Sequence, residues 1–280
     1  MLIADGQVHI WALSTPERPW PARHKPHRPE PFSKDQLLAE MDQAGVDRAI
    51  IVPPSWEGDR NDLALEAARL HPDRFAIMGV LELQSPAARG LMATWRRQPG
   101  MLGLRLSLRQ PPYRPLLLAG ELKWLWAEAE QAGVPMMVVV DPTQLHLIDE
   151  IAARHPALKL IVDHLCLHSG EKDAAAFADL DKLLKLAARP NVATKATALP
   201  TYTNDSYPFR SLHPYLRRVY DAFGPRRIFW GTDVTRLKCT YRQAVTMITE
   251  EIDWLTEEDK EWIMGRGACE WLGWKLPPTR

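Results

Sequence analysis

The sequence predicts a distorted (β/α)8 barrel, and two features of the chain lead to this fold class. Eight short apolar or β-rich runs alternate with segments of helical periodicity, an order typical of parallel βαβ units. The chain has 280 residues, close to the length of about 250 residues that is typical of such barrels. A doubly wound open sheet is the alternative. That fold usually carries a glycine-rich phosphate loop, and no GxGxxG or GxxxxGK[ST] motif occurs in the sequence.

Each predicted strand is flanked by Pro, Gly or charged residues, which end strands. The strands are expected at 2–10, 48–54, 75–83, 101–108, 135–141, 158–165, 191–198 and 226–234. Helices are expected at 34–45, 61–72, 120–133 and 143–156, and again from 234 to about 272. Because no low-complexity tract or linker interrupts this order, we expect a single domain over residues 1–280.

The predicted loops that follow strands are longer than several of those that follow helices. The long ones are 12–33, which is rich in proline, together with 109–119, 166–174 and 199–211. The helix-to-strand returns "AGVD" and "AGVP" are short. In a barrel the loops after strands build the active-site face, so elaboration at this end alone is what an enzyme would show.

The composition limits which partners the protein is expected to bind and in which cellular compartment it is expected. Lys and Arg number 35 and so do Asp and Glu, a balance that argues against a dedicated nucleic-acid binder but allows small anionic ligands. The cysteines Cys166, Cys239 and Cys269 are too few and too far apart for a disulfide framework. The N-terminus lacks the features of a signal peptide, and no apolar run approaches a membrane span. We therefore expect reduced thiols in a cytoplasmic protein.

Polar residues recur along the first predicted strand, "DGQVHIW". Because side chains alternate along a strand, Asp5, Gln7, His9 and Trp11 are expected to share one face. The outer face of a barrel packs on helices and is apolar, so this polar set is expected to point into the barrel.

Further charged residues are expected to converge at the same end. In the fourth strand Leu102, Leu104, Leu106 and Leu108 form one face, so Arg105 lies on the other and points into the barrel mouth. Lys195 lies within the seventh strand, His164 ends the sixth and Asp233 ends the eighth. Burying a charge without a partner costs several kcal/mol. A self-satisfied ion-pair network is the structural alternative, but so many groups at one end favour a functional site.

These stretches resemble a known family. "DGQVHIW", "LKLIVDHL", "VATKATA", "RRIFWGTD" and the tail "IMGRGACEWLGW" are similar, in this order, to the amidohydrolase-related family of the amidohydrolase superfamily. The resemblance covers nearly the whole chain and implies a distorted (β/α)8 barrel. The family includes lactonases that act on sugar lactones and pyrone dicarboxylates, other hydrolases, and aromatic-acid decarboxylases.

The resemblance also bears on a metal. The family pattern in the first strand is Asp-x-His-x-His, and Gln7 stands at the position of its first His. His9, His164 and Asp233 match the remaining ligands, while the fifth strand offers none. Because a Gln amide oxygen is a weak substitute for imidazole, we do not expect a binuclear centre. The cofactor expected is either none or a single zinc or manganese ion held by His9, His164 and Asp233.

The function expected is a lactonase-type hydrolysis of a small carboxylated ring compound. Asp233 is the predicted general base, and His164 and His9 would polarise the carbonyl or relay protons. The predicted substrate-binding residues are Gln7, Arg105, Lys195, Arg236, Tyr202 and Trp11. Arg105, Lys195 and Arg236 would hold the carboxylate. Trp11, Trp20, Tyr202 and Tyr207 are candidate pocket walls, although such residues also fill cores and surfaces.

Two alternatives from other classes stay open. One is a metal-dependent non-oxidative decarboxylase of an aromatic acid, which the altered first strand disfavours. The other is a non-catalytic barrel that binds a ligand, which the retained His9, His164 and Asp233 disfavour. The expected partner is a small-molecule substrate, with no nucleic acid and no membrane. Barrels of this size often pair, so a homodimer is an alternative to a monomer.

Overall fold

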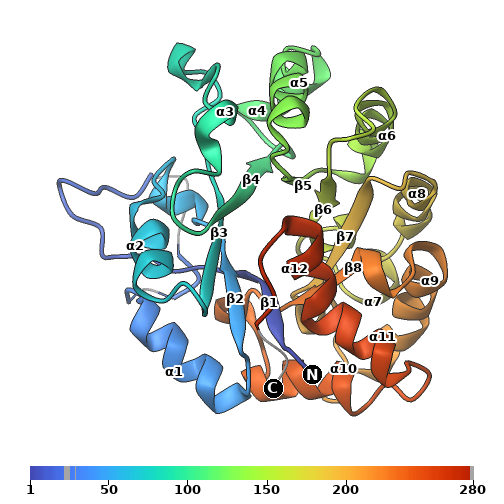
Figure 1. The fold of residues 1–280 in the computed structure, drawn as a ribbon. Helices are drawn as coiled ribbons and strands as arrows, with labels where there is room; N and C mark the ends of the chain where they lie inside the picture. The colour runs from blue at the N-terminus through green and yellow to red at the C-terminus, as the bar shows by residue number, and fades with distance from the viewer. Residues whose placement is uncertain (22–25, 29, 278–280) are drawn as a thin grey trace.

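A computed structural model describes residues 1–21, 26–28 and 30–277 of the chain. Eight parallel strands form one sheet in which each strand lies beside the next one in sequence, and the sheet curls into a barrel (Figure 1). The strands are β1 (Ala4–Val8), β2 (Arg48–Ile51), β3 (Phe75–Gly79), β4 (Met101–Ser107), β5 (Met136–Val139), β6 (Leu160–Val162), β7 (Val192–Thr197) and β8 (Ile228–Gly231). The predicted fold and all eight strands are confirmed. Residues 22–25 and 29 of the predicted 12–33 loop lie outside the described residues.

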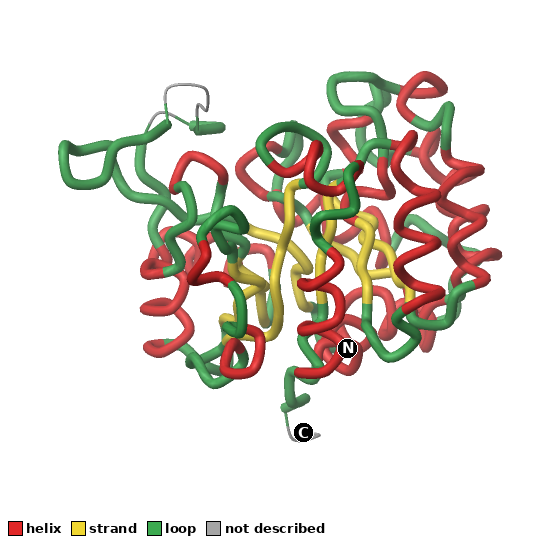
Figure 2. The backbone as a smooth tube through the Cα atoms, turned by 90° about the horizontal axis from the view of Figure 1, so that it is seen from above, coloured by secondary structure: helices red, strands yellow, loops and turns green. Residues whose placement is uncertain are grey.

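Helices surround the strands, as Figure 2 shows in a view turned by 90° from that of Figure 1. They are α1 (Lys34–Ala44), α2 (Asp62–Leu70), α3 (Met92–Trp95), α4 (Tyr113–Leu118), α5 (Lys123–Ala132), α6 (Leu145–Arg154), α7 (Asp173–Ala176), α8 (Leu180–Lys185), α9 (His213–Phe223), α10 (Tyr241–Thr249), α11 (Glu257–Glu261) and α12 (Gly267–Leu272). The four helices predicted at 34–45, 61–72, 120–133 and 143–156 correspond to α1, α2, α5 and α6, and the helical stretch predicted from 234 to about 272 contains α10, α11 and α12. Within the described ranges, no helix combines the length and apolar character that crossing a membrane requires.

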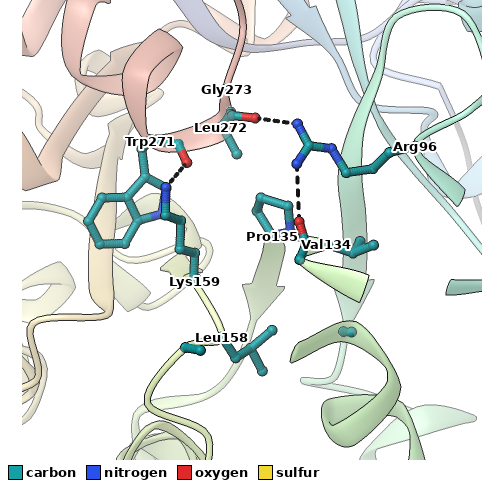
Figure 3. A pocket seen from close by; sticks show the side chains of 11 residues that line it. Arg96, Val134, Pro135, Leu158, Lys159, Trp271, Leu272 and Gly273 are labelled. Carbon is teal, nitrogen blue, oxygen red and sulfur yellow. Dashed lines mark hydrogen bonds between the residues drawn. The ribbon is translucent and has the colours of Figure 1, made fainter. Parts of the chain in front are cut away.

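The amino ends of the strands are closed by packing. Alternate strand residues fill the lower interior with side chains, namely Ile50, Ala76, Met137, Ile161, Ala193 and Phe229. Ala268 and Leu272 of α12 join this cluster from below. Figure 3 shows how Arg96 holds the end of α12, donating to the carbonyl oxygens of Leu272 and Gly133 at 3.1 Å each. The open end of the barrel is therefore the carboxyl end of the strands, where the loops after the strands gather.

The seam between β8 and β1 closes the ring without a regular strand ladder. The Asp233 N–H donates to the Gln7 carbonyl oxygen at 2.9 Å. Asp5 accepts hydrogen bonds from the N–H of Thr232 and Gln7 at 2.9 Å each, from the Tyr241 hydroxyl at 2.7 Å, and from the Thr232 hydroxyl. This buried carboxylate thus joins both strands to α10.

Asp5 does not point into the barrel mouth, so its predicted orientation is wrong. Asp5 pairs with Ala49 and Val8 with Ile51, so two residues of β1 stand opposite one residue of β2. This extra residue is a β-bulge, and it shifts the alternation of side chains between Asp5 and Gln7. Asp5 therefore faces Thr232 and Tyr241, while Gln7 and His9 face inward.

A second irregularity corrects the predicted leucine face of β4. Ile77 pairs with Met101 and Met78 pairs with Gly103, so the register shifts by one residue there. Leu102 consequently packs with the inner cluster, whereas Leu104, Leu106 and Leu108 pack outward as predicted. Beyond the shift the alternation resumes, so Arg105 reaches the interior.

The shift in β4 leaves no room for a side chain at Gly103. A Cβ there would overlap the Pro135 carbonyl oxygen and lie 2.7 Å from Cε of Met78. We expect Gly103→Ala to lower the free energy of unfolding by about 3 kcal/mol, as overpacked cores do. Gly133→Ala is the control, because its site is open and only its φ of 62° disfavours alanine, for about 1 kcal/mol. Urea denaturation measures both, and equal losses would contradict this account of the bulge.

Candidate active site

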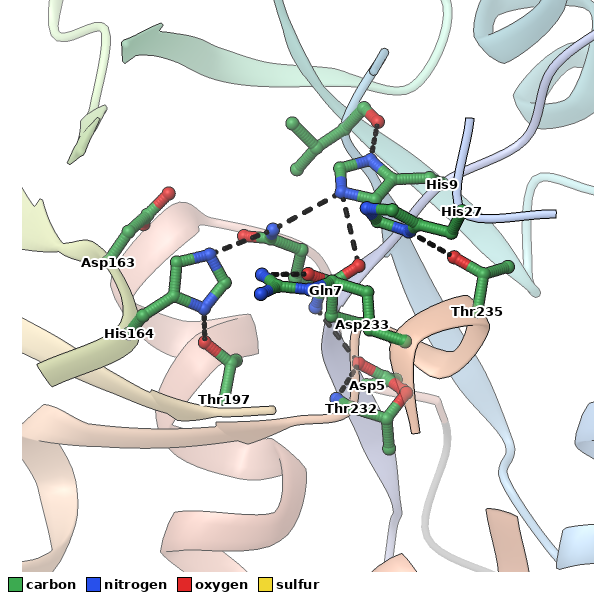
Figure 4. A network of polar contacts seen from close by, with 12 residues as sticks. Asp5, Gln7, His9, His27, Asp163, His164, Thr197, Thr232, Asp233 and Thr235 are labelled. Atoms are coloured by element: carbon green, nitrogen blue, oxygen red, sulfur yellow. Dashed lines mark hydrogen bonds and ion pairs between the residues drawn. The ribbon is translucent and has the colours of Figure 1, made fainter. Parts of the chain in front are cut away.

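The polar residues predicted to converge meet at the carboxyl ends of β1, β6, β7 and β8 (Figure 4). Gln7 lies on β1 and His9 just beyond it, Lys195 lies on β7, and His164 and Asp233 follow β6 and β8. His164 and Asp233 both have left-handed backbones, with φ of 54° and 51°. Such conformations cost about 1–3 kcal/mol for residues other than glycine and cluster at functional sites. The mouth is therefore built at a cost in stability on either side of β7.

Lys195 lies beneath the mouth rather than in it. Its side chain is fully buried, and its ammonium group donates to Oε1 of Gln7 and pairs with Oδ1 of Asp163 at 3.0 Å. Arg105 approaches the same carboxylate, with Nε 3.4 Å from Oδ2. The partners that the structure gives Lys195 are thus Asp163 and Gln7, and its contact with a substrate carboxylate stays a prediction. Lys195 reaches the mouth only through the amide of Gln7.

The two imidazole rings face one another across that amide. Nε2 of Gln7 lies 3.5 Å from Nε2 of His9 and 3.3 Å from Nε2 of His164. Nδ1 of His9 lies 2.6 Å from the Val52 carbonyl oxygen, which can only accept. Nδ1 of His164 lies 2.7 Å from the Thr197 hydroxyl. Both rings therefore carry their hydrogen on Nδ1 and present the lone pair of Nε2 to the centre.

Asp233 offers a carboxylate oxygen to the same centre. Arg236 lies 3.3 Å from its Oδ2. Oδ1 is buried with no hydrogen-bond donor in the described part of the chain, and Nε2 of His9 lies 3.2 Å away. Since that nitrogen also presents a lone pair, two acceptors face each other. Because the lone pair of His9 Nε2 also faces the Gln7 amide, the acceptor left without a donor is Oδ1 of Asp233, and a water O–H matches it.

The pKa shifts fix the charges of these groups at neutral pH. Burial alone would raise the pKa of Asp233, but the positive charges that His9, Arg236 and His164 carry in acid, where this carboxyl titrates, lower it to about 2. Burial lowers the pKa of His164 to about 3, against the opposing pull of Asp163 and Asp233. Burial also lowers the pKa of His9. The site thus holds an ionised carboxylate beside neutral imidazoles, which is a proton-accepting arrangement.

The side chains as placed do not complete a metal site. Among the residues that the structure describes, no group of three His, Cys, Asp or Glu side chains is close enough to hold one ion. His9 and Asp233 supply two facing lone pairs, but Gln7 turns its NH2 group, which has no lone pair to give, toward both imidazoles. The predicted set of His9, His164 and Asp233 therefore does not gather around one point.

Two residues of the site were missing from the sequence-based prediction. Asp163 supplies the counter-charge to Lys195 and Arg105, and alternation from the inward Ile161 would have placed it there. His27 comes from the 12–33 loop. Its Nδ1 lies 2.8 Å from the Thr235 hydroxyl, and its ring lies 5.9 Å from that of His9. No periodic pattern in that loop indicates such a contact.

The four candidate pocket walls differ in where they lie relative to the site. Tyr202 is buried after β7, and the charges of Arg236 and Asp233 act on its pKa, which burial raises. Trp11 is buried against Phe32, and Trp56 rather than Trp11 contacts the His9 ring. The other two candidate walls, Trp20 and Tyr207, also lie away from the centre. Trp20 packs on the outer core cluster, and the Tyr207 hydroxyl lies 2.9 Å from the Thr246 hydroxyl.

The cysteines agree with the prediction. Cys166, Cys239 and Cys269 are all free thiols. Burial raises the pKa of Cys166 to about 12, so this thiol beside the site stays protonated.

Comparisons with known proteins agree with the fold and identify the family. A family model described as Amidohydrolase matches residues 4–274. The chain is 27% identical over 248 residues to an L-fucono-1,5-lactonase of Burkholderia ambifaria, covering 83% of this chain and 81% of that protein. It is similar to a crystal structure of an amidohydrolase from Burkholderia multivorans with bound zinc, with a TM-score of 0.82, 23% identity, and 99% and 100% of the two chains covered. A putative 2-pyrone-4,6-dicarboxylic acid hydrolase from Pseudomonas putida gives a TM-score of 0.77 at 17% identity, with 99% of each chain covered.

The hydrogen bonds that Asp5 accepts at the seam between β1 and β8 predict how the stability of the protein depends on pH. Burial raises the pKa of Asp5 to about 6, although four hydrogen bonds to its carboxylate oppose the shift. A raised folded pKa means that the stability from Asp5 is fully present below its unfolded pKa of 3.8 and is lost as the pH rises through about 6. The advantage of the wild type over Asp5→Asn should fall by up to about 3 kcal/mol between pH 4 and pH 7.

Denaturation in guanidinium at several pH values measures this difference. Asp149→Asn is the control, because hydrogen bonds from Arg189 lower the pKa of that carboxyl. Its contribution is lost only on acidification, so its difference from the wild type should be flat from pH 5 to pH 7. A flat difference for Asp5→Asn over the same interval would show that the carboxylate is not penalised by burial.

Proposed function

This chain belongs to the amidohydrolase family, and we propose that it is a hydrolase that opens the ring of a small lactone. One observation carries the proposal. Oδ1 of Asp233 is buried at the barrel mouth with no donor among the described residues, 3.2 Å from the lone pair of His9 Nε2. A buried carboxylate without a donor is costly unless a ligand supplies one. Water does so, and it is the reactant that a hydrolase needs.

The proposed reaction uses Asp233 as a proton carrier. Water donates to Oδ1 of Asp233, and its oxygen attacks the carbonyl carbon of the lactone as Asp233 takes the proton. The tetrahedral intermediate then collapses, and the bond between the acyl carbon and the ring oxygen breaks. Asp233 returns the proton to that ring oxygen, so the product is a hydroxy acid and the carboxylate is regenerated.

Cations near the mouth would stabilise the charge that develops on the carbonyl oxygen. Arg236 lies beside Asp233, and in the described chain the Arg105 guanidinium has one hydrogen bond, from Nε to Asp163. Its terminal nitrogens are thus the natural donors toward an oxyanion. Fixed positive groups of this kind are usually the largest single contribution to such catalysis.

The substrate we propose carries a carboxylate. Lys195 and Asp163 neutralise each other below the mouth. With Arg105, Arg109 and Arg236 added, these cations outnumber the carboxylates of Asp163 and Asp233, and both Arg109 and Arg236 act on the buried Tyr202. Arginine binds planar carboxylates in two-pronged fashion. The curated relatives are named for a sugar lactone, so neutral polyhydroxy lactones are the competing class.

A substrate panel tests the proposal. A pH-stat measures acid release from neutral sugar lactones and from carboxylated lactones. Carbon dioxide release from aromatic acids is measured in parallel, because decarboxylation is the alternative chemistry. We expect acid release, with higher kcat/KM for the carboxylated lactones and a decline of that preference at high salt. Carbon dioxide release without acid release would overturn the proposal, and so would binding of a lactone without turnover.

Replacement of Asp233, the proposed general base, tests the mechanism most directly. We expect Asp233→Asn to lower kcat by about 10²–10⁴-fold with little change in KM, since an amide cannot take the proton. The amide can instead donate to Nε2 of His9, so the melting temperature should hold or rise. Asp221→Asn, in a surface pair with Arg217 on α9, is the matched control and should keep full activity. Unchanged kcat in Asp233→Asn would remove Asp233 from the mechanism.

A further inference from the structure

We propose that the amide of Gln7, held by the ammonium group of Lys195, occupies the place of a metal ion at the centre of this site and fixes the tautomers of His9 and His164. The inference concerns the same site as the proposed function and deepens it. Lys195 acts here as a positioning residue, because it touches Gln7 and not the reacting atoms. The three observations that carry the proposal are the partners of Lys195, of the amide and of each imidazole.

Lys195 decides which way the amide points. An ammonium group has three hydrogens to donate and no lone pair, so only the oxygen of the Gln7 amide can face it. Oε1 of Gln7 does accept from Nζ of Lys195. The reverse orientation would set NH2 against NH3⁺ in a fully buried place, donor against donor. The NH2 group is therefore directed to the other side, where the imidazoles lie.

Each imidazole has a second partner at Nδ1, on the side of the ring away from Gln7. The Val52 carbonyl independently requires a hydrogen on Nδ1 of His9, and so leaves Nε2 of His9 as an acceptor for Gln7. Nδ1 of His164 meets the Thr197 hydroxyl, which can accept or donate. The tautomer of His164 thus depends on Gln7, whereas that of His9 is fixed both by the Val52 carbonyl and by Gln7.

The amide does for these rings what a cation would do. It presents two positive hydrogens to two nitrogen lone pairs, and its polarity is strengthened by the positive charge of Lys195 on its oxygen. A metal ion bound by both Nε2 atoms would have to displace this NH2 group and face a donor at Gln7. Gln7 and Lys195 together thus disfavour binding of a metal ion, while the amide hydrogens of Gln7 keep a partial positive charge between the two imidazoles.

Gln7→Glu tests the proposal with almost no change in shape. A carboxylate still accepts from Lys195, but it replaces the two amide hydrogens by an oxygen that accepts. Zinc affinity is measured by chelator competition, using zinc alone as the probe. We expect Gln7→Glu to bind zinc at least about 100-fold more tightly than the wild type, since oxygen and two imidazole nitrogens are good zinc ligands. Gln131→Glu, at an exposed position on α5, is the matched control and should behave as the wild type.

The tautomers supply a readout that a merely structural role would not change. Nitrogen NMR of labelled histidines, with zinc absent and at neutral pH, distinguishes hydrogen on Nδ1 from hydrogen on Nε2. We expect both rings in the Nδ1–H form in the wild type. In Gln7→Glu we expect His164 to move its hydrogen to Nε2, to donate to the new carboxylate, while Val52 keeps His9 unchanged. The exposed His146 serves as the internal reference.

Either of two results would overturn the proposal. One is wild-type protein that binds zinc as tightly as Gln7→Glu does. The other is a His164 ring with the same tautomer in both proteins. Neither measurement involves turnover, so a failure here is distinct from a failure of the proposed lactone hydrolysis. If the protein proved to be a lactonase with tightly bound zinc, the proposal of lactone hydrolysis would stand and the proposal about Gln7 would fall.

Discussion

The buried ammonium group of Lys195 is the constraint on which the rest of the site depends. A charge removed from water must find partners, and Lys195 finds Asp163 and the oxygen of Gln7. The first pairing neutralises the charge, and the second turns the Gln7 amide so that its hydrogens face His9 and His164. With Nε2 of His9 presented as an acceptor, Oδ1 of Asp233 meets another acceptor rather than a donor. This series of hydrogen bonds therefore ends at an ionised carboxylate whose Oδ1 has no donor among the described residues.

The barrel holds this arrangement in place from below and at its seam. Packing of α12 against the inner cluster closes the amino ends of the strands, so the polar groups gather at the carboxyl ends. At the seam, Asp5 binds Thr232 and the backbone of Gln7, which sets β1 against β8 and brings Gln7 and Asp233 together. The left-handed backbones at His164 and Asp233 add a cost in stability at the site itself.

Much of this could be predicted from the chain, because strand periodicity and loop length are local properties. They locate all eight strands, and alternation places Gln7, His9, Arg105 and Lys195 inside. Alternation fails at Asp5 and Leu102, where bulges shift the register, and no residue pattern marks either bulge. Asp163 was within reach of the same reasoning, since Lys195 needs a counter-charge. His27 was not, because its loop has no periodicity and its contact with the site depends on how that loop folds back.

The central claim is that this site opens a lactone with its own residues. The most direct test is the turnover of an accepted lactone by exhaustively chelated protein, with the metal content of the same sample measured by elemental analysis. We predict that the full rate persists with metal below about one tenth of an equivalent per chain, since Asp233 and the arginines carry the chemistry. A rate that falls on chelation and returns in proportion to added zinc or manganese would contradict the account.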